Sequence, residues 1–170
     1  MVRYRISKYN PKFRDEYGCY TKQEWTSISD VDKDINGVKV SLEEYLNTES
    51  RYIKALNNIL NDLNIEYLYV MELEKQNDII NDNYTFEGFT TDMIETVNSI
   101  KEGQELDREK INYIIKAILR EVFWCGLYSK TTHLIIKPGY DFYINIICPE
   151  LSKCVIKNIS ELGLYIEEII

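Results

Sequence analysis

The chain has 170 residues, of which 45% are hydrophobic and 28% charged, and its formal net charge at pH 7 is −8. This length suits one domain with its own core, and the apolar content excludes intrinsic disorder as a description of the whole chain. A negative protein repels phosphate backbones, so the charge argues against DNA and RNA as partners. We therefore expect a single domain over residues 1–170 without a nucleic-acid partner.

The first 25 residues stand apart from this acidic background. Six Lys or Arg against three Asp or Glu give them a net charge of +3, which leaves −11 for residues 26–170. Cations interleaved with aromatic residues occur in nucleic-acid arms, but the charge of the remaining chain would oppose a phosphate backbone. We expect these cations to pair with carboxylates of the chain itself.

The first predicted element is an N-terminal strand, because Val2, Tyr4 and Ile6 alternate with polar residues. Tyr4 would be buried, and the arginines on either side of it would face outward. From there to about Asn36 the chain is irregular. A long irregular segment in a compact domain is often functional, so this segment is a candidate binding surface.

The clearest helix is predicted over residues 41–63, where apolar side chains fall on one stripe at a spacing of 3.6. Ser41 and Glu44 match a capping box at its start. Residues 65–74 follow directly. Their aromatic and β-branched content, without a polar face, predicts a strand that is buried on both sides.

Two more helices are predicted over residues 90–103 and 106–122, the second with Asp107 as its N-cap. Residues 122–148 contain three apolar runs separated by turn sequences, which indicates an antiparallel meander. Helical spacing returns over residues 151–162, and a C-terminal strand is expected after it.

Strands and helices are partly segregated along the chain, which is typical of an α+β fold. We expect a mainly antiparallel sheet with the helices packed on one face. The strands of this sheet would be the N-terminal strand, strand 65–74, the meander 122–148 and the C-terminal strand.

Residues 32–43 match the spacing of an EF-hand calcium loop, D-x-D-x-N-G-x5-E. Lys39 occupies a position that is normally apolar in such loops, and no clear amphipathic helix enters the segment. Asn36-Gly37 is also a common turn signal, so a turn is the competing interpretation. A calcium-dependent interaction module through 32–43 is kept as an alternative, and no other metal or cofactor is expected. The candidate ligands of this calcium loop are Asp32, Asp34, Asn36 and Glu43.

The sequence contains none of the common motifs of nucleotide-binding folds, zinc proteases or serine hydrolases. His133 is the single histidine, and no local motif supplies it with a nucleophile or an orienting acid. Cys125 and Cys148 lie in apolar strand patterns, where a thiol acts as a small hydrophobe. We assign no catalytic residue. A small cytoplasmic enzyme with a dispersed site made of His133, Asp141 and Tyr143 is the alternative.

The N-terminus lacks the apolar region of a secretory signal, and no apolar run approaches the ~18 residues that span a bilayer. The four cysteines include no CxxC pair and indicate no disulfide scaffold. We therefore expect a cytoplasmic protein without a membrane partner.

The remaining signal is the frequency of acids beside aromatic residues, with 14 tyrosines in the chain. Exposed tyrosines near carboxylates favour binding of a basic protein surface. The competing interpretation is that tyrosine replaces phenylalanine in the core, with its hydroxyl at the rim. The residues expected at such a binding surface are Tyr17, Tyr20, Trp25, Asp30, Tyr140, Asp141 and Tyr143.

In size, acidity, tyrosine content and lack of catalytic motifs, the chain resembles the small cytoplasmic immunity proteins that bacteria use against polymorphic toxins. The stretches EWTSISD, NGVKVSLEEYL and PGYDFYINI look like family signatures. The resemblance implies a non-catalytic binding protein, either an immunity protein or an antitoxin. Its acidic, tyrosine-rich face would block the cationic site of a toxin.

Overall fold

The computed structural model describes residues 1–75 and 88–169. Seven strands form one antiparallel sheet in the order β5-β4-β6-β7-β8-β1-β9. They are β1 (Val2–Ser7), β4 (Leu68–Glu74), β5 (Glu105–Leu106), β6 (Trp124–Tyr128), β7 (Ile135–Pro138), β8 (Ile144–Cys148) and β9 (Tyr165–Glu168). The α-helices of the described residues are α1 (Leu42–Asp62), α2 (Thr91–Ser99), α3 (Arg108–Leu119) and α4 (Lys153–Glu161).

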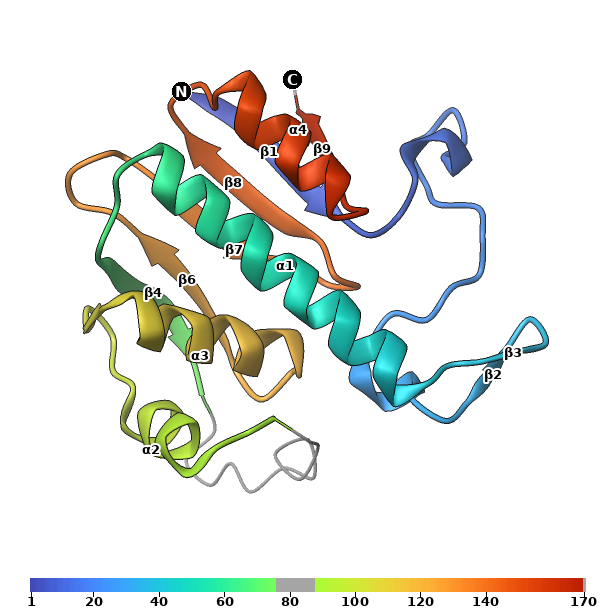
Figure 1. The fold of residues 1–170 in the computed structure, drawn as a ribbon, viewed down its shortest axis with the longest axis horizontal. Coiled ribbons are helices and arrows are strands. Elements are labelled where there is room, and N and C mark those ends of the chain that lie inside the picture. The colour runs from blue at the N-terminus through green and yellow to red at the C-terminus, as the bar shows by residue number, and fades with distance from the viewer. Residues whose placement is uncertain (76–87, 170) are drawn as a thin grey trace.

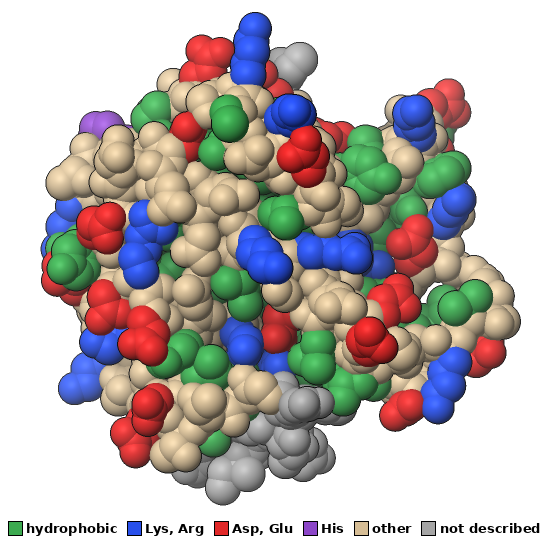
Figure 2. Space-filling view, in the orientation of Figure 1, with side chains coloured by type: hydrophobic (Ala, Val, Ile, Leu, Met, Phe, Trp, Pro, Cys, Tyr) green, Lys and Arg blue, Asp and Glu red, His purple; other side chains and the backbone are tan. Residues whose placement is uncertain are grey.

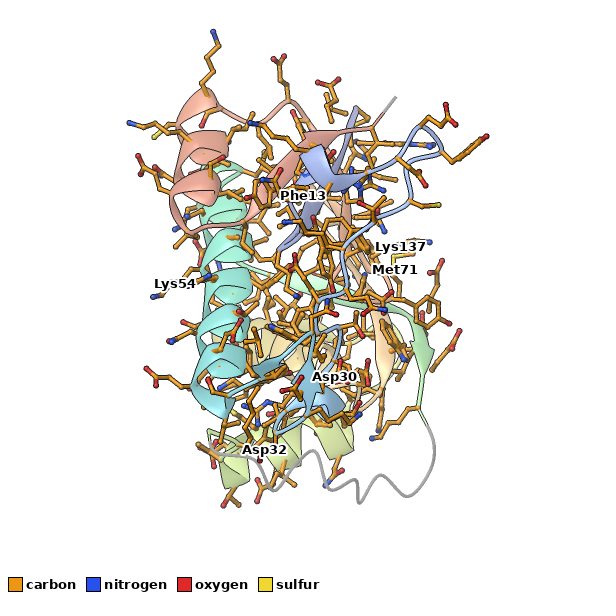
Figure 3. All side chains as sticks on the ribbon, turned by 90° about the vertical axis from the view of Figure 1, so that its right-hand side faces the viewer. Phe13, Asp30, Asp32, Lys54, Met71 and Lys137 are labelled. Carbon is orange, nitrogen blue, oxygen red and sulfur yellow. The ribbon has the colours of Figure 1, made fainter. Side chains whose placement is uncertain are left out.

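The molecule has two layers, a helical layer and the sheet. Helices α1, α3 and α4 lie over the same face of the sheet, with α1 running diagonally across it (Figure 1). In the view turned by 90°, Lys54 lies on the outer side of α1, whereas Met71 and Lys137 lie on the opposite side of the sheet (Figure 3). The fold is α+β with helices on one face, which confirms the prediction from the sequence.

Each α-helix begins at a polar side chain that accepts a hydrogen bond from its first turn. Ser41, Thr90, Asp107 and Ser152 are these N-caps. Such caps satisfy backbone N–H groups that have no partner inside the helix. The predicted role of Asp107 is confirmed, since its Oδ1 accepts from the Lys110 amide at 2.9 Å.

The core lies between the helices and the inward face of the sheet. Helix α1 contributes Tyr45, Tyr52, Leu56 and Ile59, all of which are fully or almost fully buried. Their spacing of three, four or seven residues places them on one face of the helix. From the sheet, the alternate residues point toward this helix stripe: Tyr4, Ile6, Leu68, Val70, Leu127, Ile136, Ile144 and Ile146.

Strand β4 differs from its prediction in length and in burial. It begins at Leu68, and only alternate residues are buried: Leu68 and Val70 are inward, whereas Tyr69 and Met71 are partly exposed. The prediction of burial on both sides is therefore wrong, because the α-helices cover only one face of the sheet. The sequence also did not predict three strands of two residues each. They are β2 (Asp34–Ile35), β3 (Val38–Lys39) and β5.

The irregular N-terminal segment, residues 8–41, passes around one end of the sheet and leads into α1 (Figure 1). It contains two short 3-10 helices, η1 (Pro11–Phe13) and η2 (Ile28–Asp30). Trp25 is only 6% exposed and packs edge-on against Phe142, with a ring-centroid distance of 5.2 Å. The segment therefore closes one end of the hydrophobic core.

Three of the six cations of the basic opening pair with the chain's own carboxylates, so the prediction is confirmed for Arg5, Lys8 and Arg14. Arg5 faces outward from β1 and lies opposite Glu167 of β9, with a distance of 3.7 Å between Nη2 and Oε2. Arg14 binds the same carboxylate, with Nη1 2.6 Å from Oε1. Lys8 lies beside Glu24 at 3.5 Å.

Candidate functional site: the open face of the sheet

The face of the sheet that the helices leave uncovered, here called the open face, carries a row of partly exposed apolar side chains. Tyr69 pairs across strands with Tyr128, and Tyr128 pairs with Ile135. Ile135 in turn pairs with Ile147. Residues directly opposite one another in an antiparallel sheet point to the same face. We call these four residues the open-face row.

Tyr69 is the best-anchored residue of this row. Its ring lies 5.6 Å from that of Tyr128, between centroids, and the ammonium of Lys130 lies 3.5 Å from its centroid. Its hydroxyl donates to Glu105, and this hydrogen bond is the main reason why the pKa of Tyr69 is raised. The row thus places an aromatic surface beside both a cation and a carboxylate.

A β-bulge in β4 borders the row. The pairing of β4 with β6 shifts between Met71 and Glu74, and Glu72 has a φ of +52°. The carboxylate of Glu102 accepts hydrogen bonds from the amides of Glu72 at 3.1 Å and Leu73 at 2.9 Å. A bulge redirects the side chains around it, and here it directs acidic residues to the margin of the open face.

Glu102→Ala is expected to lower the free energy of unfolding by about 1 kcal/mol, because two bulge amides lose a charged acceptor that water replaces only in part. Urea denaturation would measure this loss. Glu102→Gln keeps one acceptor oxygen and should lose less. Equal losses in the two variants would contradict the assigned role of the carboxylate.

A hollow of about 210 Å³ opens beside the bulge, between β4, β6 and β7. We call it the Trp124 hollow. Gly126 leaves room for the side chain of Met71, because a Cβ at position 126 would lie 2.9 Å from Cγ of Met71. The ring of Trp124 lies 5.6 Å from that of Tyr140, which is 81% exposed. The side chains that line the hollow include Glu72, Glu74, Trp124, Lys137, Pro138 and Tyr140.

The two carboxylates of the Trp124 hollow differ in their partners. Glu72 binds Lys137, with Oε1 2.7 Å from Nζ. Glu74 is exposed and has no ion pair among the described residues. The hollow therefore combines two aromatic rings, one internal ion pair and one free carboxylate.

Cys125 also borders the hollow, but its chemistry is that of a core residue. The side chain is buried, and burial raises the pKa of its thiol to about 12, with a smaller contribution from Glu102. A protonated thiol is a poor nucleophile. The open face thus offers a surface for contact and no group prepared for covalent catalysis at this position.

The binding residues predicted from the sequence lie in different environments. Tyr140 borders the hollow, and Asp141 is exposed beside it in the turn between β7 and β8. Tyr17 is 84% exposed in the N-terminal segment. Trp25 is buried, and the carboxylate of Asp30 accepts from backbone amides and pairs with Lys33. Partly buried positions are held by Tyr20 and Tyr143.

Trp124, Tyr128 and Met71 were not among the residues predicted for this site. Residues 124–128 do carry a signal for the open face, because the rings of Trp124 and Tyr128 lie four positions apart on one face of the strand, opposite the apolar Cys125 and Leu127. The sequence could not show that no helix covers this side of β6. That depends on where the helical layer packs.

The dispersed catalytic site does not assemble in this structure. His133 lies in the turn between β6 and β7, whereas Asp141 and Tyr143 lie in the turn between β7 and β8. These turns are at opposite ends of β7, a strand of four residues that spans about 13 Å. The three side chains therefore do not share one pocket.

The segment that matches a calcium loop contains a short hairpin, in which β2 pairs with β3. Asn36 and Gly37 both have positive φ, at 56° and 78°, as a type I′ turn requires. Asp34 accepts from the Gly37 amide at 2.7 Å, and Asp32 pairs with Lys39 at 2.8 Å. In the described part of the chain, no group of three or more His, Cys, Asp or Glu is arranged to hold a metal ion.

Comparisons with protein-family models, curated proteins and solved structures give no significant match. Among residues 1–75 and 88–169, no helix has the length and apolar character to cross a membrane.

Proposed function

We propose that this protein is a non-catalytic protein-binding module of the immunity-protein or antitoxin kind, which blocks a basic partner protein with its open face. The observation that carries the proposal is the open-face row with the adjoining Trp124 hollow. It presents aromatic and aliphatic side chains on the face of the sheet that is not covered by α1, α3 and α4, the face on which Met71 and Lys137 lie (Figure 3).

The composition of this surface suits protein recognition. Trp and Tyr are enriched at the centres of protein interfaces, because a rigid ring buries a large area at low cost in conformational entropy. Trp124, Tyr128 and Tyr140 supply such rings. On the helical side, by contrast, basic and acidic side chains are interspersed over the surface (Figure 2).

The charge of the chain favours a basic partner. The net charge is −8, and Glu72, Glu74 and Glu105 lie at the margin of the open face. Charges of opposite sign on two proteins speed their association and select against acidic competitors. Lys130 and Lys137 lie on the same face against Tyr69 and Glu72, so the carboxylate that stays available to the cationic active site of a nuclease-like toxin is that of Glu74.

We place the protein in the cytoplasm, where such a partner would have to be neutralised. All four cysteines are free thiols, and Cys19 and Cys154 are exposed. Exposed free thiols persist best in a reducing compartment.

Co-expression with the product of the adjacent open reading frame in a bacterial host tests the proposal. We expect the neighbouring product to arrest growth alone, growth to recover with this chain, and the two purified proteins to form a complex in gel filtration. A neighbour that is neither toxic nor bound by this chain would overturn the proposal.

Trp124→Ala is expected to raise the dissociation constant of this complex by at least about 30-fold, because a central tryptophan typically contributes 2 kcal/mol or more. Isothermal titration calorimetry would measure the change. Tyr113→Ala is the matched control, since this partly exposed tyrosine lies on α3 in the helical layer. If Tyr113→Ala weakened the complex as much as Trp124→Ala, the partner would not bind at the open face.

A further inference from the structure

We infer that the Trp124 hollow binds one lysine or arginine side chain of the basic partner. The inference rests on the proposed function and names the group that the hollow recognises. Its basis is the juxtaposition of two aromatic rings and an unpaired carboxylate in a space that suits one side chain.

The size of the hollow argues for a side chain rather than a small molecule. Its volume is about 210 Å³, whereas pockets for drug-sized ligands measure about 300–1,000 Å³. It is open to solvent beside Tyr140, which is strongly exposed. A long side chain on the surface of a partner protein can enter from that direction.

The walls of the hollow suit a cation. An ammonium or guanidinium group is attracted to the face of an aromatic ring within about 6 Å of its centre. Trp124 and Tyr140 supply two such rings, and Glu74 supplies a carboxylate with no ion pair in the described chain. Lys137 neutralises only Glu72, so the carboxylate of Glu74 leaves the three charged groups of the hollow with a net negative charge that attracts a cation.

The chain itself uses the same combination at Lys8. The Lys8 ammonium lies 4.4 Å from the ring centroid of Tyr9 and 4.0 Å from that of Trp25. Glu24 pairs with it at 3.5 Å. Two aromatic rings and one carboxylate therefore bind an ammonium group within this fold. The Trp124 hollow presents the same three components at the surface.

A titration with a short arginine peptide, Ac-Gly-Arg-Gly-Arg-Gly-NH2, tests the inference, with the indole N–H resonance of Trp124 as the readout. Trp124→Phe identifies this resonance by its disappearance. At low salt, we expect the Trp124 signal to shift and saturate while the signal of the buried Trp25 stays in place. The same peptide with citrulline in place of arginine is neutral and should bind at least tenfold more weakly.

Two substitutions separate cation binding from a general surface effect. Glu74→Gln removes the unpaired carboxylate and should raise the dissociation constant of the peptide up to about fivefold, the range of an exposed ion pair. Lys137→Met removes the competing internal cation and should lower the dissociation constant of the peptide. Glu74 and Lys137 are both at least partly exposed, so the melting temperature of each variant should stay close to that of the parent.

Equal shifts with the arginine and citrulline peptides, or an unchanged dissociation constant in Glu74→Gln, would overturn the inference. The proposed function is judged separately, by the complex with the neighbouring gene product. If Trp124→Ala disrupts that complex while Glu74→Gln leaves it intact, the open face is the interface and only the cation site is wrong. If neither variant weakens the complex, the partner does not bind at the open face, and the assignment of the interface and that of the cation site are both wrong.

Discussion

Glu49→Gln is expected to lower the free energy of unfolding by about 3–5 kcal/mol, the usual cost of removing one partner from a buried ion pair. Glu49 is 4% exposed at its side chain and Arg120 is 0% exposed. Their atoms form two close contacts, 2.6 Å from Nε to Oε2 and 3.0 Å from Nη2 to Oε1. The variant leaves the guanidinium buried beside a neutral amide.

Lys116 adds to this effect. Its Nζ lies 3.9 Å from Oε1 of Glu49. Burial lowers the pKa of Lys116, and the carboxylate of Glu49 opposes that shift. Without the carboxylate, two neighbouring cations in the cleft between α1 and α3 repel one another with less compensation.

Chemical denaturation would measure the loss, and the melting temperature should fall by about 6–20 °C. Glu95→Gln, an exposed position on α2, is the control and should change stability by less than about 0.5 kcal/mol. A double variant, Glu49→Leu with Arg120→Met, should recover much of the loss, because it removes both charges from the core. A single variant as stable as the control would show that the pair is dispensable.

Trp25→Ala is expected to lower the free energy of unfolding by about 3–5 kcal/mol, as for other large-to-small changes at buried aromatic positions. The indole packs on Tyr45 and Phe142, with centroid distances of 5.7 and 5.2 Å. Its Nε1 donates to Glu44 at 3.1 Å, and the Lys8 ammonium lies over its ring. Truncation leaves a cavity and removes the cover from one end of the core.

Tyr17→Ala is the matched control, because Tyr17 is a strongly exposed aromatic residue of the same N-terminal segment. We expect it to change stability by less than about 0.5 kcal/mol. Urea denaturation followed by near-ultraviolet circular dichroism would compare the two variants. If both variants changed the free energy of unfolding by a similarly small amount, the N-terminal segment would be an appendage and not a part of the core.

The long elements could be predicted because each carries a clear period. Apolar residues at 3.6 spacing specify α1, and strict alternation specifies β1. The meander over 122–148 follows from three apolar runs with turn residues between them. Strands β2, β3 and β5 have only two residues each, which is too short to show any period.

The candidate site could be predicted only in part. Tyr140 and Asp141 stand out as an aromatic residue and an acid in a turn sequence. Trp124, Glu72 and Glu74 join them only because β4, β6 and β7 are neighbours in the sheet. Glu72 and Glu74 lie 68 and 66 positions before Tyr140 in the chain, and no local pattern records a pairing over that distance.

The sequence by itself determined the class of the fold, the inward stripes of the long elements and the acidic character of the surface, because these depend on local periodicity and on composition. Only the tertiary structure decided which face of the sheet stays uncovered and where the basic opening lies. The helical layer covers one face, so Tyr69 and Trp124 reach the surface, and the opening segment buries Trp25 where it closes the core. Such outcomes depend on contacts between residues far apart in the chain.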